Sequence, residues 1–183
     1  MLKGQRFNRI LLTTFSLAFV VGGLLSLFYF RRHGFSPVGT AFYVLLFFAV
    51  AQTIVDSLLF ILPLTLSGAT FVLGAFLFYG EGAPLMPRFL VAAAVGSLFF
   101  ALALLRIRGR EALGFGDVWW GATIAFFLGD PSLIPPMLLM SSLLGILLVF
   151  ILSGISGSPL RETRIPFGPA LSIAGVLTMI FSV

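Results

Sequence analysis

Two aspartates, Asp56 and Asp117, stand in apolar sequence, where a charged side chain needs an explanation. Asp56 lies inside the run AVAQTIVDSLLFILP, about two helical turns before Pro63. A charged aspartate at the centre of a membrane costs about 2.5–3.5 kcal/mol. Asp117 ends the segment GFGD, where Gly114 and Gly116 allow a close approach of the backbone before an apolar helix. Both aspartates are therefore candidates for function, with a structural partner for each as the alternative.

Two carboxylates in one site of low dielectric do not easily ionise together, because like charges repel each other. One then keeps its proton and acts as general acid, while the other acts as general base on a water molecule. This is the chemistry of an aspartic protease, in which the two carboxylates are the catalytic groups. It needs neither a metal ion nor a cofactor, so we expect no metal site and no cofactor.

Other kinds of site find little support in the sequence. The remaining acids fall in predicted loops, where a solvated charge is the ordinary expectation: Glu81, Glu111, Asp130 and Glu162. The absence of cysteine excludes disulfides, thiolate metal sites and a cysteine nucleophile. The single histidine, His33, argues against a histidine zinc site and against a Ser-His-Asp triad.

The composition places the chain in a membrane. Of its 183 residues, 60% are hydrophobic and only 9% are charged, whereas a soluble domain carries roughly 25% charged residues. We predict an all-α, polytopic helical bundle that has the lipid bilayer as its surroundings. The net charge is +5, but the basic residues form short clusters between apolar stretches. This pattern reflects membrane topology and predicts no nucleic-acid partner.

The apolar stretches predict about seven membrane spans in one domain, 1–183, and a six-span interpretation is the alternative. The run from Ile10 to Phe30 has 21 residues, too many for a cleavable signal, so we interpret it as the first span. The predicted spans are 10–30, 38–62, 64–80, 88–105, 116–129, 133–153 and 166–182. Orientation follows from the loop arginines and lysines, which favour a cytoplasmic N-terminus, with eight on that side and three on the other.

The lengths of the spans place the two aspartates at similar depth. The helix from Phe115 to Leu128 has 14 residues and is about 21 Å long, which is less than the roughly 30 Å of the hydrocarbon core. Asp117 therefore lies below the inner surface, about 18 Å from the outer one, and non-helical backbone at that depth requires a protein-lined or water-filled cavity. Asp56 lies about 22–28 Å from the outer end of its own span. This counting allows the carboxylates to meet but does not show that they do.

Three segments in matching order resemble the type IV prepilin peptidases, a GxGD family of intramembrane aspartic proteases. They are IVDSLLFILP, GREALGFGDVWWGATIAFFLG and IPFGPAL at 165–171, and the loop HGFSP at 33–37 is similar to one in the family. The resemblance implies that Asp56 and Asp117 are the catalytic pair. It also implies that Gly114, Gly116, Pro63, Phe167, Gly168 and Pro169 support the site.

The resemblance further implies an endopeptidase of the prokaryotic cytoplasmic (inner) membrane. Its substrates would be type IV prepilins or pseudopilins, cut after a short basic leader at the cytoplasmic face, in a type IV pilus or type II secretion system. Bacterial members usually carry a cysteine-bearing N-terminal cytoplasmic region associated with N-methylation. Only about nine residues precede the first predicted span and cysteine is absent, so we do not expect methyltransferase activity.

Departures from the family pattern keep a second function open. Where the family often has further acids or a lysine, this chain has Leu58, Leu64 and Trp119. The alternative is therefore a catalytically weak or inactive homologue that acts as a membrane transporter or assembly factor. Cleavage of prepilin leaders distinguishes the two functions.

Local interpretations also have alternatives. Pro63 either ends the helix of Asp56 as part of the site or is a simple helix break. The segment 167–169 either borders the catalytic cavity or is a turn into the last helix. Trp119 and Trp120 are either interfacial anchors or walls of the cavity.

Overall fold

The computed structural model describes residues 37–59, 62–107, 110–111, 113–156 and 166–181, together with Val20, Leu24 and Leu27. These last three residues are helical. The predicted first span, 10–30, otherwise lies outside the described residues. The same is true of the HGFSP loop before Pro37 and of the arginine cluster at 161–164.

The helices of the described ranges follow the predicted spans closely. They are α2 (Pro37–Leu59), α3 (Leu64–Gly80), α4 (Leu85–Leu104), α5 (Phe115–Leu128), α6 (Ile134–Ser156) and α7 (Gly168–Phe181). No helix boundary departs from its predicted span by more than three residues. The apolar run lengths therefore predicted the helices well.

Short irregular elements interrupt the helices. The segment after α4 forms an antiparallel pair of two-residue strands, β1 (Arg106–Ile107) and β2 (Arg110–Glu111), where the sequence predicted only a loop. A short 3-10 helix, η1 (Pro131–Leu133), precedes α6. Between α5 and η1, Gly129 adopts a left-handed conformation with φ of 67°, which ends α5 without the steric cost that a side chain would add.

The bundle has the character of a membrane protein. Three helical stretches are long and apolar enough to cross a bilayer, namely Gly39–Leu59, Leu85–Leu104 and Pro131–Ile151, and α3, α5 and α7 are shorter apolar helices. Large apolar side chains such as Phe76, Met86 and Phe150 are exposed on the outside. A soluble protein rarely exposes so much apolar surface, so the chain forms a polytopic helical membrane bundle.

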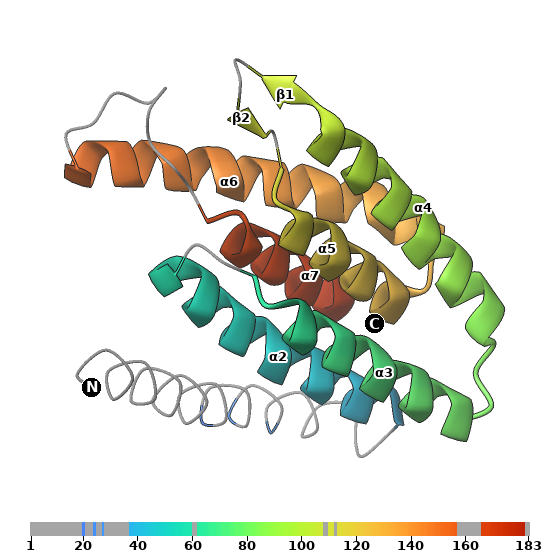
Figure 1. The fold of residues 1–183 in the computed structure, drawn as a ribbon. Coiled ribbons are helices and arrows are strands. Elements are labelled where there is room, and N and C mark those ends of the chain that lie inside the picture. Colours follow the sequence, from blue (N-terminus) through green and yellow to red (C-terminus); the bar gives the residue numbers. More distant parts are fainter. Residues whose placement is uncertain are drawn as a thin grey trace, which may run out of the picture.

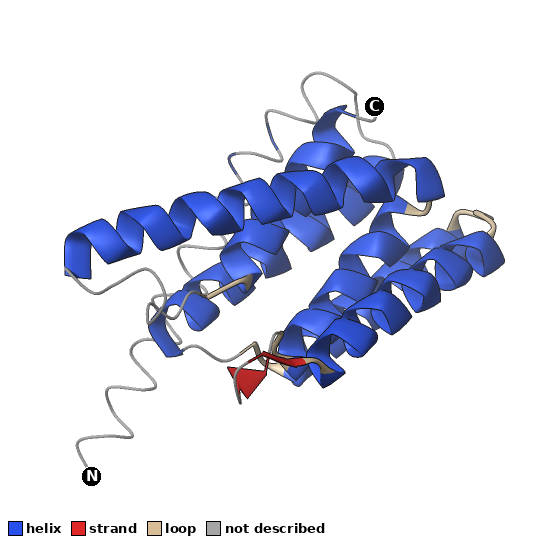
Figure 2. Ribbon diagram, turned by 90° about the horizontal axis from the view of Figure 1, so that it is seen from above, coloured by secondary structure: helices blue, strands red, loops and turns tan. Residues whose placement is uncertain are grey.

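Helix α5 lies at the centre of this bundle. It packs against α2, α3, α4 and α7, and α6 packs mainly against α7 (Figure 1). The view turned by 90° shows the two strands at one end of the helices (Figure 2). The C-terminus of α2 and the N-termini of α5 and α7 also lie at this end, which we call the strand end.

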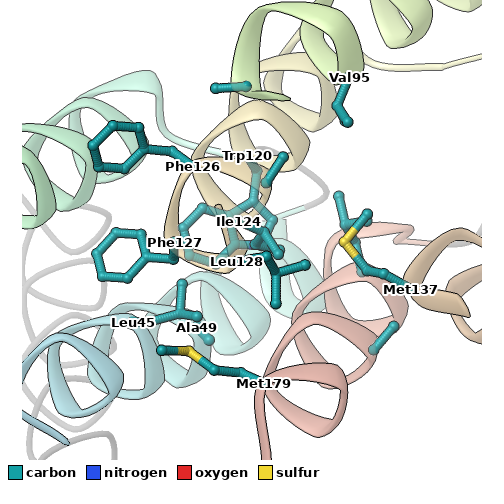
Figure 3. Packing of buried hydrophobic residues seen from close by; sticks show 14 of the residues in the cluster. Leu45, Ala49, Val95, Trp120, Ile124, Phe126, Phe127, Leu128, Met137 and Met179 are labelled. Atoms are coloured by element: carbon teal, nitrogen blue, oxygen red, sulfur yellow. The ribbon is translucent and has the colours of Figure 1, made fainter. Parts of the chain in front are cut away.

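The core is built around the apolar side chains of α5. Trp120, Ile124 and Phe126 contribute to a cluster of buried residues to which α2, α3, α4, α6 and α7 also contribute (Figure 3). A Cβ atom on Gly121 would lie 2.5 Å from the ring of Phe99, so this glycine allows α4 and α5 to approach closely. Helices in a membrane associate without a hydrophobic driving force, so the close van der Waals packing that small residues allow helps to hold them together.

Candidate active site

Asp56 lies near the C-terminus of α2 and is 4% exposed. Its Oδ2 atom accepts a hydrogen bond of 2.9 Å from the backbone N–H of Gly168, the first residue of α7. The first N–H groups of a helix have no partner within that helix. The N-terminus of α7 therefore supplies a main-chain donor to the Asp56 carboxylate, at the end of the helix where a negative charge is favoured.

The absence of a side chain at Gly168 leaves room for this contact. A Cβ atom at this position would lie 2.7 Å from Asp56 Oδ2 and 3.0 Å from Leu62 Cδ1. The first distance is too short for a carbon atom and the second is tight, so a side chain would shift the carboxylate and press on Leu62. Pro169 follows at the second helical position, where its missing N–H removes no helical hydrogen bond.

Asp117 is the third residue of α5 and is 7% exposed. Its Oδ2 atom accepts a hydrogen bond of 3.1 Å from the backbone N–H of Gly114, the residue before the helix. The N–H of Asp117 in turn donates to the carbonyl of Gly114 at 3.0 Å. This reciprocal arrangement resembles a capping box, with a main-chain carbonyl in place of the usual N-cap hydroxyl. It fixes the Asp117 side chain against the start of its own helix.

The second carboxylate oxygen of Asp117 is left without a protein partner. Oδ1 is buried and has no hydrogen bond to any of the described residues. A buried oxygen in this state costs free energy unless a proton, a water molecule or a substrate group satisfies it. Among the described residues, Asp117 Oδ1 is therefore a buried acceptor that is available for a further hydrogen bond.

The structure brings the two aspartates together at the strand end. They lie close enough to interact electrostatically, although 60 residues separate them in the sequence. Within the described part of the chain, no three histidine, cysteine or acidic residues gather as metal ligands.

Leu62 packs between the glycine motifs of the two helices. A Cβ atom on Gly116 would lie 2.5 Å from Leu62 Cβ and 2.9 Å from the Leu62 carbonyl oxygen. Because Leu62 also touches the position of Gly168, one side chain fills the space between the starts of α5 and α7. The sequence drew attention to Gly116 and Gly168 but gave no sign that Leu62 is their common neighbour.

Pro63 is the residue before α3, and its carbonyl accepts hydrogen bonds from the N–H groups of Leu66 and Ser67 at 3.1 and 3.3 Å. Leu62, the residue before it, is not helical, which agrees with the restriction that proline places on the preceding residue. Pro63 thus begins α3, and Leu62 lies beside it against the starts of α5 and α7.

Phe167 supports the site from a greater distance than Gly168. Its ring faces α6, where a Cβ atom on Gly145 would lie 3.3 Å from Phe167 Cε2. Its carbonyl accepts a hydrogen bond of 3.1 Å from the N–H of Leu171 in the first turn of α7. The segment 167–169 is therefore a turn into the last helix and also contacts Asp56, so its two interpretations are compatible.

The two tryptophans of α5 have separate roles. Trp119 is exposed and lines an apolar groove of about 430 Å³ that runs beside the first half of α5. Trp120 is fully buried in the core and donates a hydrogen bond to Ser172. Trp120 is therefore not an interfacial anchor. The groove is lined by Phe71, Phe89, Ala92, Ala93, Gly96, Ser97, Phe100, Phe115, Val118, Trp119 and Ala122.

Comparison with known proteins points to one family. The chain is 36% identical over 126 residues to the prepilin leader peptidase/N-methyltransferase of Aeromonas hydrophila and to that of Aeromonas salmonicida. The aligned part covers 66% of this chain and 40% of each relative. No protein-family model matches the chain, and no solved structure matches it.

Proposed function

The chain is homologous to the type IV prepilin peptidases, and from this premise we propose that it is an aspartic endopeptidase with Asp56 and Asp117 as its catalytic pair. The observation that supports this proposal is that two buried carboxylates, from α2 and α5, lie at the same end of the bundle and within electrostatic reach of each other. Each carboxylate is held by a main-chain amide, and one oxygen of Asp117 remains free to accept a further hydrogen bond.

The proposed reaction is hydrolysis of a peptide bond by general acid–base catalysis. One carboxylate removes a proton from a water molecule, and the water oxygen then bonds to the carbonyl carbon of the scissile peptide. The other carboxyl group, which is protonated, supplies a proton to the leaving amine when the C–N bond breaks. Two carboxylates in one buried site favour this division of roles, because they do not readily carry two negative charges.

The proposed substrates are prepilins or pseudopilins with short basic leaders, and the names of the relatives support this class. The proposed site lies at the strand end, where Arg106 and Arg110 of the short strands also lie. Loops rich in arginine and lysine tend to face the cytoplasm. We therefore propose that cleavage takes place at the cytoplasmic face of the inner membrane, with the N-terminus on the same side, in a type IV pilus or type II secretion system.

Replacing either aspartate tests the proposal. We expect Asp56→Asn and Asp117→Asn each to lower kcat for cleavage of a co-purified prepilin by about 10²–10⁴-fold, because each removes an acid–base group. The measurement is release of the leader in inside-out vesicles that contain equal amounts of each variant.

Asp130→Asn is the matched control. Asp130 is exposed, and its Oδ1 accepts a hydrogen bond of 2.8 Å from the N–H of Ser132, which an asparagine oxygen can also accept. This variant should cleave at the wild-type rate. Normal cleavage by Asp56→Asn would overturn the assignment, and absence of cleavage by the wild type on a panel of leaders would favour the transporter or assembly-factor alternative.

A further inference from the structure

Helices α2 and α5, which carry the aspartates, touch each other over a short stretch only, and both also pack against α3 and α7. Of these two neighbours, α7 is the one that donates a hydrogen bond to an aspartate. The separation of the two carboxylates therefore depends in part on how α2 and α5 are each fixed to α7. Asp56 is fixed directly, through its hydrogen bond with the N–H of Gly168.

A buried polar contact fixes α5 to the same helix. The indole N–H of Trp120 donates a hydrogen bond of 2.9 Å to Ser172 Oγ. Trp120 is 0% exposed and Ser172 is 2% exposed. Bulk water therefore does not reach either group and cannot take the place of the bonding partner. An indole N–H that lost its acceptor there would remain unpaired, and a buried unpaired donor costs free energy. This cost favours the alignment of α5 and α7 in which the bond forms.

The position of this bond relates it to both carboxylates. Trp120 lies about one turn after Asp117 on α5, and Ser172 lies about one turn after Gly168 on α7. A short path therefore joins the two aspartates, from Asp56 to Gly168, along one turn of α7 to Ser172, across to Trp120, and back to Asp117. Each step on this path is a hydrogen bond or about one helical turn, so the bond between Trp120 and Ser172 is the link between α5 and α7 on a short path from one aspartate to the other.

We propose that Trp120 and Ser172 are positioning residues that set the separation of the Asp56 and Asp117 carboxylates through their mutual hydrogen bond. This inference rests on the proposed peptidase function. It assigns to Trp120 a role in alignment that differs from anchoring at the interface and from contact with the substrate. Reactions of this kind are sensitive to the positions of the reacting groups, and a misplacement of about 1 Å costs about a hundredfold in rate.

The first test separates catalysis from binding. We expect Ser172→Ala to lower kcat about tenfold to a hundredfold while KM stays within about twofold, because the alignment of the carboxylates changes and the substrate contacts do not. The matched control is Ser141→Ala. Ser141 is 1% exposed, and its hydroxyl donates only within its own helix, to the carbonyl of Leu138 at 2.9 Å. This control should keep kcat within about twofold of the wild type.

A double variant shows whether the two side chains act through their mutual bond. If they do, Ser172→Ala should add little to the loss of kcat that Trp120→Phe causes alone, because the bond is already absent. Independent losses that multiply in the double variant would overturn the proposal. Because Ser172→Ala removes a single oxygen atom, it remains informative even if Trp120→Phe does not fold.

A second readout does not depend on cleavage. The chain contains no cysteine, so cysteines placed at the exposed positions Leu58 and Trp119, each two residues after an aspartate, allow spin labels to report the distance between α2 and α5. Ser172→Ala should shift or broaden the distance distribution, and Ser141→Ala should leave it unchanged. Identical distributions for the two variants would overturn the proposal. A shift in a chain that cleaves no prepilin would support the alignment by Trp120 and Ser172 and would overturn the proposed function alone.

Discussion

At the scale of single residues, the proposed site relies on main-chain donors. Asp56 accepts a hydrogen bond from the N–H of Gly168, and Asp117 accepts one from the N–H of Gly114. Hydrogen bonds to a carboxylate are stronger than those between neutral groups, so the two amides hold the side chains in defined orientations. The close approach of Gly168 to Asp56 makes this glycine the most demanding position of the site.

We predict that Gly168→Ala lowers cleavage about tenfold to a hundredfold, because its Cβ atom would meet Asp56 Oδ2 and displace a carboxylate that catalysis requires in place. The measurement is kcat for leader release at equal amounts of protein in the membrane.

Gly154→Ala is the control for this substitution. Gly154 lies in α6, and a Cβ atom there would meet nothing within 4 Å. This variant should keep its activity, and its helix should be slightly more stable because alanine favours helix over glycine. Equal activity of the two alanine variants would show that the space beside Asp56 does not matter for cleavage.

At the scale of elements, α5 is fixed at both ends. Gly114 and Asp117 bond to each other at its start. At its end, the guanidinium of Arg88 on α4 donates to the carbonyls of Phe126 and Phe127 at 3.2 and 2.8 Å. The last carbonyls of a helix have no partner within it, so Arg88 satisfies two of them while it lies 3.7 Å from the centre of the Phe78 ring.

We predict that Arg88→Met lowers the free energy of unfolding by about 1–3 kcal/mol, because it leaves two carbonyls of α5 without their donor in an apolar environment. Arg88→Lys should lose less, since its ammonium group can still donate to one of them. Thermal unfolding in detergent, followed by circular dichroism, measures both variants. Equal stability of Arg88→Met and the wild type would show that other groups satisfy these carbonyls.

The elements also show which parts of the structure the sequence could predict. The helices α2 to α7 follow from the lengths of apolar runs, since a bilayer sets the length of a span. The choice of Asp56 and Asp117 as candidates also follows from the sequence, because a carboxylate in such a run is costly, and their burial at one end of the bundle agrees with it. In contrast, the bond between Trp120 and Ser172 joins residues 52 positions apart, and no local pattern indicates it. The role of Arg88 at the end of α5 is not visible in the sequence either, because an arginine that caps a helix cannot be told apart there from one of the loop arginines that indicate topology.

At the scale of the whole molecule, the groups of the proposed site gather at one end of the bundle. The end of α2 and the starts of α5 and α7 meet there, and Leu62 fills the space between Gly116 and Gly168. Arg88 holds the opposite end of α5. Among the described residues, the two fully buried ionisable side chains, Asp56 and Asp117, thus lie at the same end of the bundle, and apolar side chains make up most of the core.

We predict that the 183-residue chain releases the leader without methylating the new N-terminus. The relatives are named as both peptidase and N-methyltransferase, but this chain aligns with 40% of their length and contains no cysteine. A methyl donor such as S-adenosylmethionine also needs a concave site with several polar groups. Incubation with a prepilin and labelled donor, followed by mass analysis of the product, is the measurement. Stoichiometric methylation would show that neither cysteine nor the unaligned part of the relatives is needed.

The use of main-chain amides at the proposed site affects which substitutions nearby should be tolerated. A backbone N–H survives almost every substitution, proline excepted, so the hydrogen bonds from Gly114 and Gly168 do not depend on polar side chains nearby. Neighbouring positions are then free to exchange polar for apolar residues, and Leu58, Leu64 and Trp119 are all exposed side chains of this kind. We therefore expect substitutions to be tolerated at exposed side chains near the carboxylates and to be poorly tolerated at Gly114 and Gly168.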